Sequence, residues 1–599
     1  MTTAALSASG TTAPRAPGTT APRAPGTTAP HAPGTTRPLV SGPRHAISAG
    51  HYLATGAGLA ILEAGGNAID AGVAAGLVLG VVQPDIVNFG GVAPIIIRRA
   101  DGRVESIAGL GHWPMSLPPD IFMREHGGKM PRGVLRTVVP AAPDAWITAL
   151  QHHGTMGFAD VAGAAIRFAE EGFPVYPMFA ESIASHAKDY AEFPTNAAIF
   201  LPGGKPHAVG ELFIQKDLAA TIRHMADEDR RAAAKGGREA GLAAAHHAFY
   251  RGDIAQRIVR FMKEQGGYLS AEDLANFRSR LEPAVTRDWR GHAVTTSGPW
   301  CQGPALLEAL LLMEKAGFDG LPHNSPDYLH LMAECLKVAM ADREYHFGDP
   351  AFRNVPLDTL LGDAHLAARL AGIDPARAHP GMPEPLLDQG TGTHARSERL
   401  VAAIEPDTSY VAVVDREGNA FSATPSDGTW NVPVIPGLGF VASPRGTQSR
   451  PDPSHPCGVR PGARPRLTPN PALVVTREGA VIPLGTPGGD VQIQAMLQVI
   501  LNHLHFGMDL QAAIEAPRVA TYSFPSSFAP YDYFPGRLAV EARIPAATRD
   551  ALRARGHEIQ DWPDWTWLAG SVEAVRYDPA TGVKMGGADP RRPAYAMAM

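Results

Sequence analysis

The clearest hydrophobic pattern lies at the start of the globular part of the chain, which begins at about Ser48. In His51–Glu63, apolar residues recur every three or four positions and the run stops at Gly65–Gly66, which predicts an amphipathic helix. Residues Asn67–Gly80 predict a second, alanine-rich helix. Because that helix has almost no polar residue, we expect it to be buried on all sides.

Strand patterns follow the two helices. Ala93–Ala100 and Val104–Ala108 are predicted to be strands joined by a turn at Asp101–Gly102. Between about Asp144 and Gly372 the apolar residues return to a helical spacing, so this long middle part is expected to be largely helical. Periodicity alone therefore indicates a mixed α and β fold.

A long segment without periodicity interrupts the second half of the chain. Pro375–Glu398 is rich in Pro, Gly and His, which predicts a flexible loop of a length that is unusual unless it has a function. It leads almost directly into Thr408–Asp415, a β-branched strand, which a hairpin turn at Arg416–Asn419 connects to a second strand ending at Thr424. This junction between a mobile loop and a buried strand is the most informative place in the sequence.

The N-terminal segment, residues 1–43, has a different composition. An eight-residue unit starts at Gly10 and returns at Gly18, Gly26 and Gly34. Proline in every unit removes backbone donors, and apart from proline no residue larger than alanine offers apolar surface to bury. We expect a tail that is disordered or locally polyproline-like.

Composition limits the classes of function. The chain has 599 residues, and 53 Lys and Arg against 59 Asp and Glu give a net charge of −6. This balance gives no electrostatic reason to expect nucleic acid or an anionic membrane as a partner. No apolar run reaches about 18 residues, and the N-terminus lacks a charged-then-apolar signal pattern. A cytoplasmic protein is expected.

Neither a disulfide framework nor a metal site is expected from the sequence. The three cysteines, Cys301, Cys335 and Cys457, are far apart and have no CxxC spacing, and Cys335 falls in a helical pattern typical of a core. The 23 histidines include no HExxH motif. No cofactor is expected, and the partner that the sequence favours is a small-molecule substrate.

Short motifs in a fixed order carry a resemblance that extends over Ser48–Asp589. They are Ala64–Ala71, Ala341–Arg343, Gly348–Pro350, Asp407–Thr408 ahead of Val413–Asp415, Gly418–Asn419, Gly485–Asp490, Glu515–Arg518 and Gly587–Pro590. Together they resemble the gamma-glutamyltransferase-like family of N-terminal-nucleophile (Ntn) hydrolases. The resemblance implies an α/β fold, a four-layer α/β/β/α sandwich, with Asn419 structural in its hairpin turn.

The resemblance also implies that Thr408 is the nucleophile. A threonine hydroxyl is a poor nucleophile without a base, but the α-amino group of an N-terminal threonine, with a pKa near 8, can serve as that base. The implied precursor cuts itself between Asp407 and Thr408, giving a large subunit, residues 44–407 with the flexible loop 375–400, and a small subunit, 408–599. Whether two such pairs of subunits form a dimer is not decided by the sequence. Without the surrounding motifs, Thr408 would be interpreted as an ordinary β-branched residue at the start of a strand.

Three further residues are candidates for the catalytic site. Gly488 and Gly489 follow a predicted strand, where two backbone N–H groups would stabilise an oxyanion, although a turn that needs positive φ explains them as well. Ser426 occupies a position where the family often has a hydroxyl supporting the nucleophile. A turn at Pro425–Gly428 is the equal alternative for Ser426.

The sequence departs from the family where the glutamyl-specific members bind their substrate. Leu110 stands where an arginine would pair with the substrate carboxylate, and leucine cannot form that pair. Of the family's paired serines, only Thr468 keeps a hydroxyl, and Gln448 replaces an acid that would bind an ammonium group. The pocket is therefore expected to take a different amide.

Other side chains are candidates for binding that amide. Arg445 or Arg466 would bind an anionic group, with a surface arginine as the alternative for each. His112 and Trp113 would form an apolar or aromatic wall.

Four functions remain open from the sequence. The first is a self-processing amidohydrolase of unknown amide, which we favour. The second is a gamma-glutamyl hydrolase or transpeptidase, which Leu110 and Gln448 disfavour, and the third is an acylase like the cephalosporin acylases of the same family. The fourth is a non-cleaving pseudoenzyme that acts as a binding protein, which the retention of Thr408 and of Gly488–Gly489 disfavours.

Overall fold

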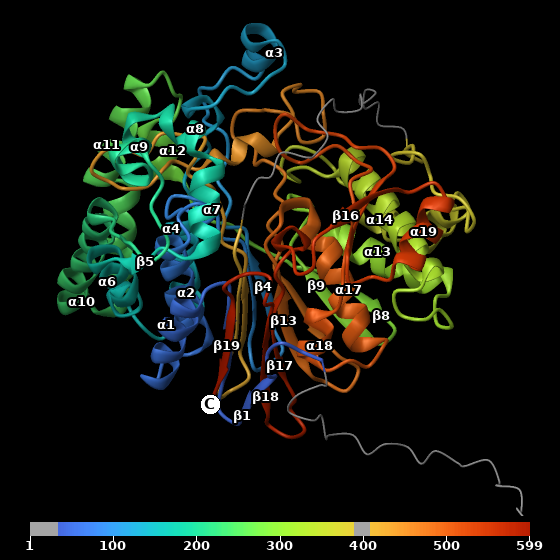
Figure 1. Ribbon diagram of the computed structural model, residues 1–599. Helices are drawn as coiled ribbons and strands as arrows, with labels where there is room; N and C mark the ends of the chain where they lie inside the picture. Colours follow the sequence, from blue (N-terminus) through green and yellow to red (C-terminus); the bar gives the residue numbers. More distant parts are fainter. Residues whose placement is uncertain (1–33, 388–407) are drawn as a thin grey trace, which may run out of the picture.

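Strand β10 (Val411–Val414) shows how the layers of the fold arise. Val411 and Val413 contribute to one hydrophobic core, and Ala412 and Val414 contribute to another, because successive side chains of a strand point to opposite faces. The strand is thus buried on both faces. In the computed structural model, which describes residues 34–387 and 408–599, it lies in one of two sheets that pack face to face between helical layers (Figure 1).

Each of the two sheets has seven strands, and all neighbouring pairs within them are antiparallel. Sheet 1 has the order β19 (Tyr595–Ala598), β2 (Ala46–Ala49), β10, β11 (Ala420–Ala423), β3 (Ile95–Arg98), β4 (Val104–Ile107), β7 (Leu281–Glu282). Sheet 2 has the order β1 (Val40–Gly42), β18 (Lys584–Ala588), β17 (Glu573–Tyr577), β13 (Val481–Gly485), β12 (Ala472–Val475), β9 (His292–Thr296), β8 (Val285–Trp289). Smaller sheets join β14 (Val519–Thr521), β15 (Arg537–Glu541) and β16 (Glu558–Trp562), and β5 (Phe173–Pro174) with β6 (Leu212–Phe213).

Helices cover the outer face of each sheet (Figure 1). On the side of sheet 1 are α1 (Tyr52–Glu63), α2 (Ala68–Val82), α4 (Ala142–His153), α5 (Phe158–Val161), α6 (Gly163–Glu171), α7 (Pro177–Ser185), α8 (Ala187–Ala191), α9 (Pro194–Phe200), α10 (Lys216–Tyr250), α11 (Asp253–Glu264) and α12 (Ala271–Asn276), whereas α3 (Ile121–His126) lies at the top of the view. On the side of sheet 2 are α13 (Gly303–Ala316), α14 (Pro326–His346), α15 (Leu357–Leu360), α16 (Asp363–Leu370), α17 (Gln492–Leu504), α18 (Leu510–Glu515) and α19 (Ala546–Ala554). Short 3₁₀ turns include η3 (Pro444–Gln448), η4 (Gly489–Val491) and η5 (Trp567–Ala569).

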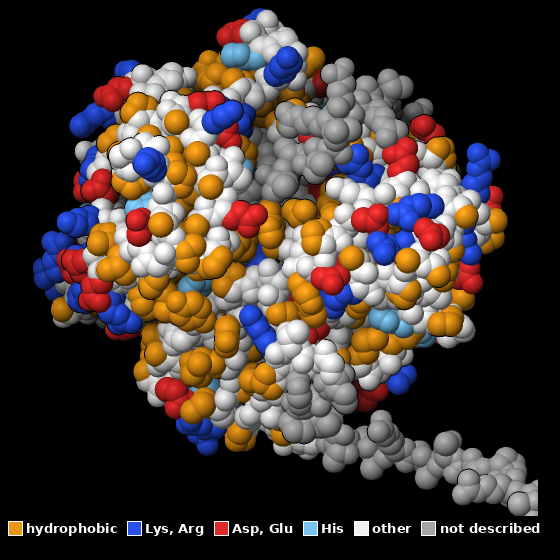
Figure 2. Space-filling model, viewed as in Figure 1, with side chains coloured by type: hydrophobic (Ala, Val, Ile, Leu, Met, Phe, Trp, Pro, Cys, Tyr) orange, Lys and Arg blue, Asp and Glu red, His pale blue; other side chains and the backbone are white. Residues whose placement is uncertain are grey.

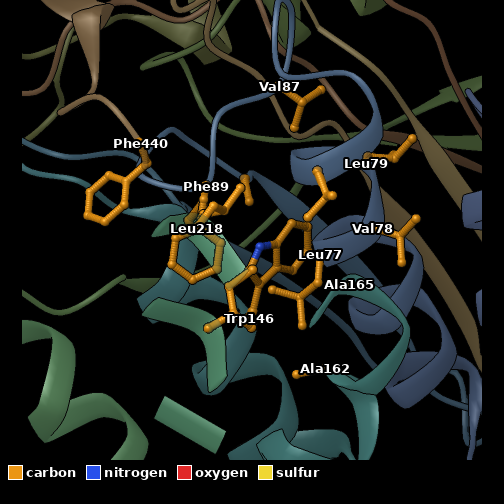
Figure 3. Packing of buried hydrophobic residues seen from close by; sticks show 14 of the residues in the cluster. Leu77, Val78, Leu79, Val87, Phe89, Trp146, Ala162, Ala165, Leu218 and Phe440 are labelled. Carbon is orange, nitrogen blue, oxygen red and sulfur yellow. The ribbon is translucent and has the colours of Figure 1, made fainter. Parts of the chain in front are cut away.

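The second helix of the chain, α2, is buried along its whole length, as its composition predicts. Asn67 caps it, and its side chain accepts hydrogen bonds from the backbone of the first turn. The ring of Trp146 packs so closely on α2 that a Cβ at Gly76 would lie 2.6 Å from it. Figure 3 shows Trp146 among residues of α2 such as Leu77, within the core that supports sheet 1.

Most predicted elements of the first hundred residues and of the 408–424 hairpin are confirmed, and the middle part is largely helical, but the boundary of the N-terminal tail is wrong. The tail was expected to reach residue 43, whereas Val40–Gly42 forms β1, in which Val40 pairs with Gly586. The largely helical middle also contributes β8 and β9 to sheet 2. Residues 375–387 form neither helix nor strand, and the rest of the predicted loop, like the first 33 residues, lies outside the described part of the chain.

The surface shows mixed charge. On the face drawn in Figure 2, Lys and Arg side chains are interspersed with Asp and Glu and with hydrophobic groups, so no patch of a single sign dominates this face. None of the helices between residues 34 and 387 or from 408 onward combines the length and the hydrophobicity needed to span a bilayer.

Candidate active site

Thr408 lies at the start of the strand segment that becomes β10, and its backbone is strained. Its φ is +82°, a left-handed conformation that a β-branched residue rarely adopts. The residue is fully buried, and its backbone N–H donates to the carbonyl of Ile86 at 3.0 Å. Such strain costs on the order of 1–3 kcal/mol and persists only where the surrounding structure enforces it.

The hydroxyl of Thr408 lies 2.7 Å from the hydroxyl of Ser426. Ser426 follows β11, and a bridge to Val92 positions it, with the Ser426 N–H donating to the Val92 carbonyl at 3.0 Å. Asp427, the next residue, has a φ of +119°, so strained backbone occurs on both sides of this contact. The hairpin that the sequence predicts is what brings the two hydroxyls together.

A second group reaches Thr408 from helix α17. The side-chain amide of Gln492, the first residue of α17, donates to the Thr408 hydroxyl at 3.3 Å. Its oxygen accepts from the backbone N–H of Asn470 at 3.1 Å, which orients the amide. No motif in the sequence includes Gln492, although it stands two residues after Gly485–Asp490.

Gly488 and Gly489 adopt conformations that explain why glycine is needed. Their φ values are +121° and +57°, so the turn interpretation holds for both. The carbonyl of Gly488 accepts from the Val491 N–H at 2.9 Å and therefore points along α17. Since C=O and N–H oppose each other in a trans peptide, the N–H of Gly489 points away from that helix. Gln302 holds the loop by donating to the Gly489 carbonyl at 2.9 Å.

Arg445 is buried, so the alternative that it is a surface arginine is wrong. It is buried in η3, and its guanidinium donates to the Ser426 hydroxyl and forms an ion pair with Asp427. The Asp427 carboxylate also accepts from the Ser443 hydroxyl at 2.5 Å. Arg445 therefore contacts the residue that contacts Thr408.

Arg466 is fully buried as well, and the surface alternative is wrong for it too. Its guanidinium pairs with Glu344 at 2.5 Å, and Arg450 pairs with the other oxygen of the same carboxylate at 2.6 Å. Although burial alone would raise it, the two guanidinium groups hold the pKa of Glu344 well below its usual range. The structure thus gives Arg466 a protein carboxylate as its partner.

The remaining predicted binding residues lie within the protein interior around the site. The Gln448 amide donates to the Thr468 hydroxyl at 2.8 Å, so these two substitutions relative to the family pattern contact each other. Leu110 packs in a small apolar cluster with Val92 and Leu467. All of these side chains are buried.

His112 and Trp113 do not line the aromatic cavity described below. Trp113 is fully buried, packs against Phe122 in its own core cluster and donates to Ser449 at 2.9 Å. His112 is half-buried, with its ring 5.9 Å from that of Phe277. The prediction that these two residues together form a wall of the substrate pocket is therefore not supported by their contacts. Although they are adjacent in sequence, their side chains contact different parts of the protein.

An aromatic cavity opens beside Gly488 and Gly489, which form part of its wall. The segment between β14 and β15, the end of β16 and η5 supply most of the remaining wall. Six aromatic side chains line it: Tyr522, Phe524, Phe528, Phe534, Trp562 and Trp567. The sequence does not indicate this cavity, because its aromatic residues come from separate segments without a shared motif.

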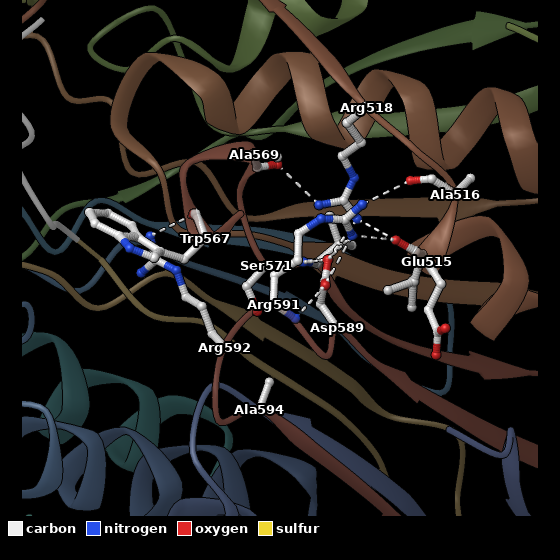
Figure 4. Close-up of polar contacts among 12 residues, drawn as sticks. Glu515, Ala516, Arg518, Trp567, Ala569, Ser571, Asp589, Arg591, Arg592 and Ala594 are labelled. Carbon is white, nitrogen blue, oxygen red and sulfur yellow. Dashed lines mark hydrogen bonds and ion pairs between the residues drawn. The ribbon is translucent and has the colours of Figure 1, made fainter. Parts of the chain in front are cut away.

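Arg592 connects this cavity to Thr408. It lines the cavity, and its guanidinium lies 3.5 Å from both the Thr408 and the Trp567 carbonyl oxygens. Figure 4 shows Arg592 beside Trp567, whereas its neighbour Arg591 turns to Asp589. Arg592 follows the Gly587–Pro590 motif by two residues, the only signal in the sequence that points to it.

Two buried carboxyl groups share the surroundings of Arg592. Burial raises the pKa of Asp85, which precedes the Ile86 carbonyl that Thr408 contacts, to about 6. Burial also raises the pKa of Glu573, which accepts a hydrogen bond from Ser571 at 2.7 Å. Arg592 opposes both shifts.

The four-layer α/β/β/α arrangement, with Thr408 entering the central sheet, defines the fold of the N-terminal-nucleophile hydrolases. The family model described as Gamma-glutamyltranspeptidase matches residues 54–599, and the chain belongs to that family of amide-hydrolysing enzymes.

The similar proteins include both acylases and a glutathione hydrolase-like protein. The chain is 32% identical to the Acylase ACY 1 proenzyme of Pseudomonas sp. (strain SE83) over 87% of each chain. It is 31% identical to the Glutathione hydrolase-like YwrD proenzyme of Bacillus subtilis (strain 168), over 89% of this chain and 94% of the relative. The crystal structure of cephalosporin acylase from Bacillus halodurans matches with a TM-score of 0.81 at 29% identity, covering 94% of this chain and 97% of the other.

Proposed function

We propose that this chain is a precursor that cleaves itself between Asp407 and Thr408 and then hydrolyses an amide bond through an acyl-enzyme on Thr408. The observation that carries the proposal is the 2.7 Å contact between the hydroxyls of Thr408 and Ser426, on a threonine with strained backbone. The word proenzyme in the names of the two relatives supports it.

In the processing step, the Thr408 hydroxyl loses its proton and its oxygen attacks the carbonyl carbon of Asp407. The peptide C–N bond breaks, the Thr408 nitrogen takes a proton and an ester replaces the amide. Water then hydrolyses the ester, which leaves a carboxylate on Asp407 and a terminal amine on Thr408. The products are a large subunit ending at residue 407 and a small subunit of residues 408–599.

In the hydrolytic step, the new α-amino group accepts the hydroxyl proton, and the oxygen attacks the substrate carbonyl. Arg445 donates to Ser426, which favours Ser426 giving its own proton to the Thr408 oxygen. Gln492 donates to the same oxygen. The Gly489 N–H, with that of Gly488, is assigned to the oxyanion. The amine leaves with a proton, and water releases the acid.

The amide is not a γ-glutamyl compound in this proposal. Leu110 lies in an apolar cluster and offers no charge to a carboxylate, and the Thr468 hydroxyl is engaged by Gln448. The aromatic cavity beside the glycines favours an acylase with a larger acyl group, a candidate that the names of two matched proteins also support. Arg445 would act through Ser426 rather than as a carrier of the substrate anion.

Intact mass under denaturing conditions tests the proposal, on the purified protein and on Thr408→Ala. Two chains that sum to the precursor plus one water, the smaller beginning at Thr408, with an uncut variant, are the expected result. Thr408→Ser, which keeps a hydroxyl, is expected to cut. One uncut chain in every sample would reject the nucleophile and leave the binding-protein function as the better account.

A further inference from the structure

We infer that Cys457, activated by His455 and two buried arginines, is a reactive thiolate and a site of oxidation by peroxides. The inference goes beyond the proposed function, because Thr408 takes no part in it. Cys457 is a free cysteine at the end of a loop, residues 451–457, whose base is closed by a bridge between Arg450 and Gly458.

Cys457 has the geometry of an activated nucleophile. Its sulfur lies 3.4 Å from Nδ1 of His455, and Nε2 of the same imidazole lies 3.4 Å from the Glu344 carboxylate. The Nδ1 atom also accepts the backbone N–H of Cys457 at 3.2 Å, which keeps the ring beside the sulfur. A nucleophile, a base within its reach and a third group that orients the base together form the arrangement that activates a thiol.

The charges around the loop favour an anion on the sulfur. Glu344 of α14 forms ion pairs with both Arg450 and Arg466, at 2.6 and 2.5 Å. Further N–H groups of these two arginines donate to the carbonyls of Ser526 and Arg343, which carry no net charge. Two buried guanidinium groups thus share one carboxylate, and a thiolate beside them balances the second positive charge where water screens it little.

The same groups act on the acidity of the thiol. Burial would raise it, but Arg466, His455 and Arg450 lower the pKa of Cys457 to about 6. The ionisable groups that face the sulfur or its imidazole partner are Glu344 of α14, Arg353 beyond it, Arg450, His455, Arg466, and Tyr531 between β14 and β15. Burial raises the pKa of Tyr531, so that this side chain stays neutral.

The two other cysteines lie in different surroundings. Cys335 lies within α14 in the core on the outer side of sheet 2, and Cys301 packs in a small cluster with Trp300 and Leu467. Burial raises the pKa of both thiols, so both remain protonated and unreactive at neutral pH. They are therefore internal controls for Cys457 in the same chain.

A short loop separates Cys457 from solvent. The side chain is only 3% exposed, but Asp452 and Ser454 of the loop are exposed and His455 is partly buried. Backbone hydrogen bonds of 3.0 Å, from Arg450 to Cys457 and from Val459 back to Arg450, close the base of the loop. Such a loop opens locally at a much lower free energy than the core, and hydrogen peroxide is hardly larger than water.

The oxidation step is balanced by the peroxide itself. The sulfur attacks one oxygen of hydrogen peroxide, an S–O bond forms and the O–O bond breaks. The second oxygen leaves as hydroxide and takes the proton of the new sulfenic acid, so the products are sulfenate and water. The sulfur loses two electrons and the peroxide gains them. The sulfenate keeps one negative charge beside the arginines.

The experiment uses the purified full-length protein, reduced and then freed of reductant. Brief alkylation with iodoacetamide at neutral pH, followed by denaturation, labelling of the remaining thiols with an isotopic form of the reagent and peptide mass spectrometry, gives the modified fraction of each cysteine. We expect Cys457 to react at least about 10-fold faster than Cys301 and Cys335, because the thiolate is the nucleophile. Hydrogen peroxide with dimedone, which captures sulfenic acids, is expected to give its adduct at Cys457.

Variants test the activation. His455→Asn keeps an acceptor for the Cys457 N–H and removes the base, and it is expected to slow the alkylation of Cys457 by about 3–10-fold. His224→Asn, in α10, is the matched control and should leave the rate unchanged. The ultraviolet absorbance of the thiolate is expected to titrate near pH 6 in the natural protein and to be absent from Cys457→Ser.

Three results would overturn the inference. They are alkylation of Cys457 no faster than that of Cys301 and Cys335, no dimedone adduct at Cys457, and an unchanged rate in His455→Asn. A sulfur that titrates near pH 6 but gives neither product belongs to the first two, because the loop then never exposes it. A chain that stays uncut at Thr408 and still reacts at Cys457 overturns the proposed function and keeps the inference.

Discussion

The hydroxyls of Thr408 and Ser426 lie 2.7 Å apart, and the hairpin β10–β11 is the element that joins them. Replacing Ser426 by alanine removes this partner while leaving the Gln492 contact to Thr408 in place. We expect Ser426→Ala to slow self-cleavage and amide hydrolysis by about 10–100-fold, since a hydrogen bond to a charged or developing charged group contributes about 1.5–3 kcal/mol. Time courses of the two chains on gels, and kcat on the processed enzyme, measure the effect.

Ser422 supplies the control for that prediction. It is a buried serine of β11, the strand that precedes Ser426, and its hydroxyl lies 2.6 Å from that of Tyr410. Ser422→Ala should lower thermal stability by about 1 kcal/mol and leave the rate of cleavage unchanged. Equal slowing by both variants would mean that the strand, and not the hydroxyl of Ser426, governs the reaction.

The two glycines are expected to differ in their response to alanine. A Cβ at Gly489 would meet only the ring of Phe528 at 3.1 Å, and its φ of +57° is accessible to alanine at a modest cost. The φ of +121° at Gly488 is not accessible in this way. Gly488→Ala should therefore reduce kcat by at least about 100-fold, the effect of losing an oxyanion donor, while Gly489→Ala should reduce it less. Measurement of kcat on the two purified variants tests this prediction. A larger loss of kcat in Gly489→Ala than in Gly488→Ala would contradict the roles assigned to the two glycines.

Arg466 provides a prediction on stability instead of binding. Arg466→Met leaves Glu344 buried with Arg450 and without its second guanidinium. Breaking a buried pair from one side costs about 3–5 kcal/mol. We expect a large fall in the unfolding midpoint, compared with little change in Arg477→Met, whose pair with Glu478 is exposed. A stable Arg466→Met enzyme with a raised KM would restore Arg466 as a substrate ligand.

How far the sequence predicts this molecule depends on the range of each signal. The capped helix α2 and the hairpin around Asn419 were predictable because cap, turn and period all lie within a few residues, and Asn419 indeed bonds Asp415 in its own turn at 2.8 Å. The four layers followed only from the family resemblance. No local pattern indicates that β1 pairs with β18, which lies more than 500 residues away.

In the candidate site too, local motifs predict some residues, and other residues are placed there only by the tertiary fold. Motifs located Thr408 and the two glycines, whereas Gln492 and Arg592 reach Thr408 from elements far along the chain. Burial of arginines is equally invisible in a linear sequence. Arg445 was expected either on the surface or on a substrate, and its partners are side chains whose positions depend on the complete fold.

A buried acid in α13 predicts how stability changes with pH. Glu308 is fully buried, and neither of its oxygens has a hydrogen-bond donor within residues 34–387 and 408–599. Burial raises its pKa to about 7 although Arg369 and His365 oppose the shift. The folded state therefore holds a proton that the unfolded chain releases at its ordinary pKa of about 4.5. Since the native state binds more protons between these two values, stability falls as pH rises from about 4.5 to about 7, and by at most about 3 kcal/mol.

Glu308→Gln removes this titration and is expected to flatten the fall of the unfolding midpoint between pH 5 and pH 8. The variant should gain relative to the natural protein at pH 8 and not at pH 5, because the ionised carboxylate exists in the core only at the higher pH. Glu272→Gln, at an exposed position of α12, is the control and should shift both points equally. An identical pH dependence in the natural protein and Glu308→Gln would show that a cation compensates Glu308 in solution, and the metal content of the purified protein would then identify it.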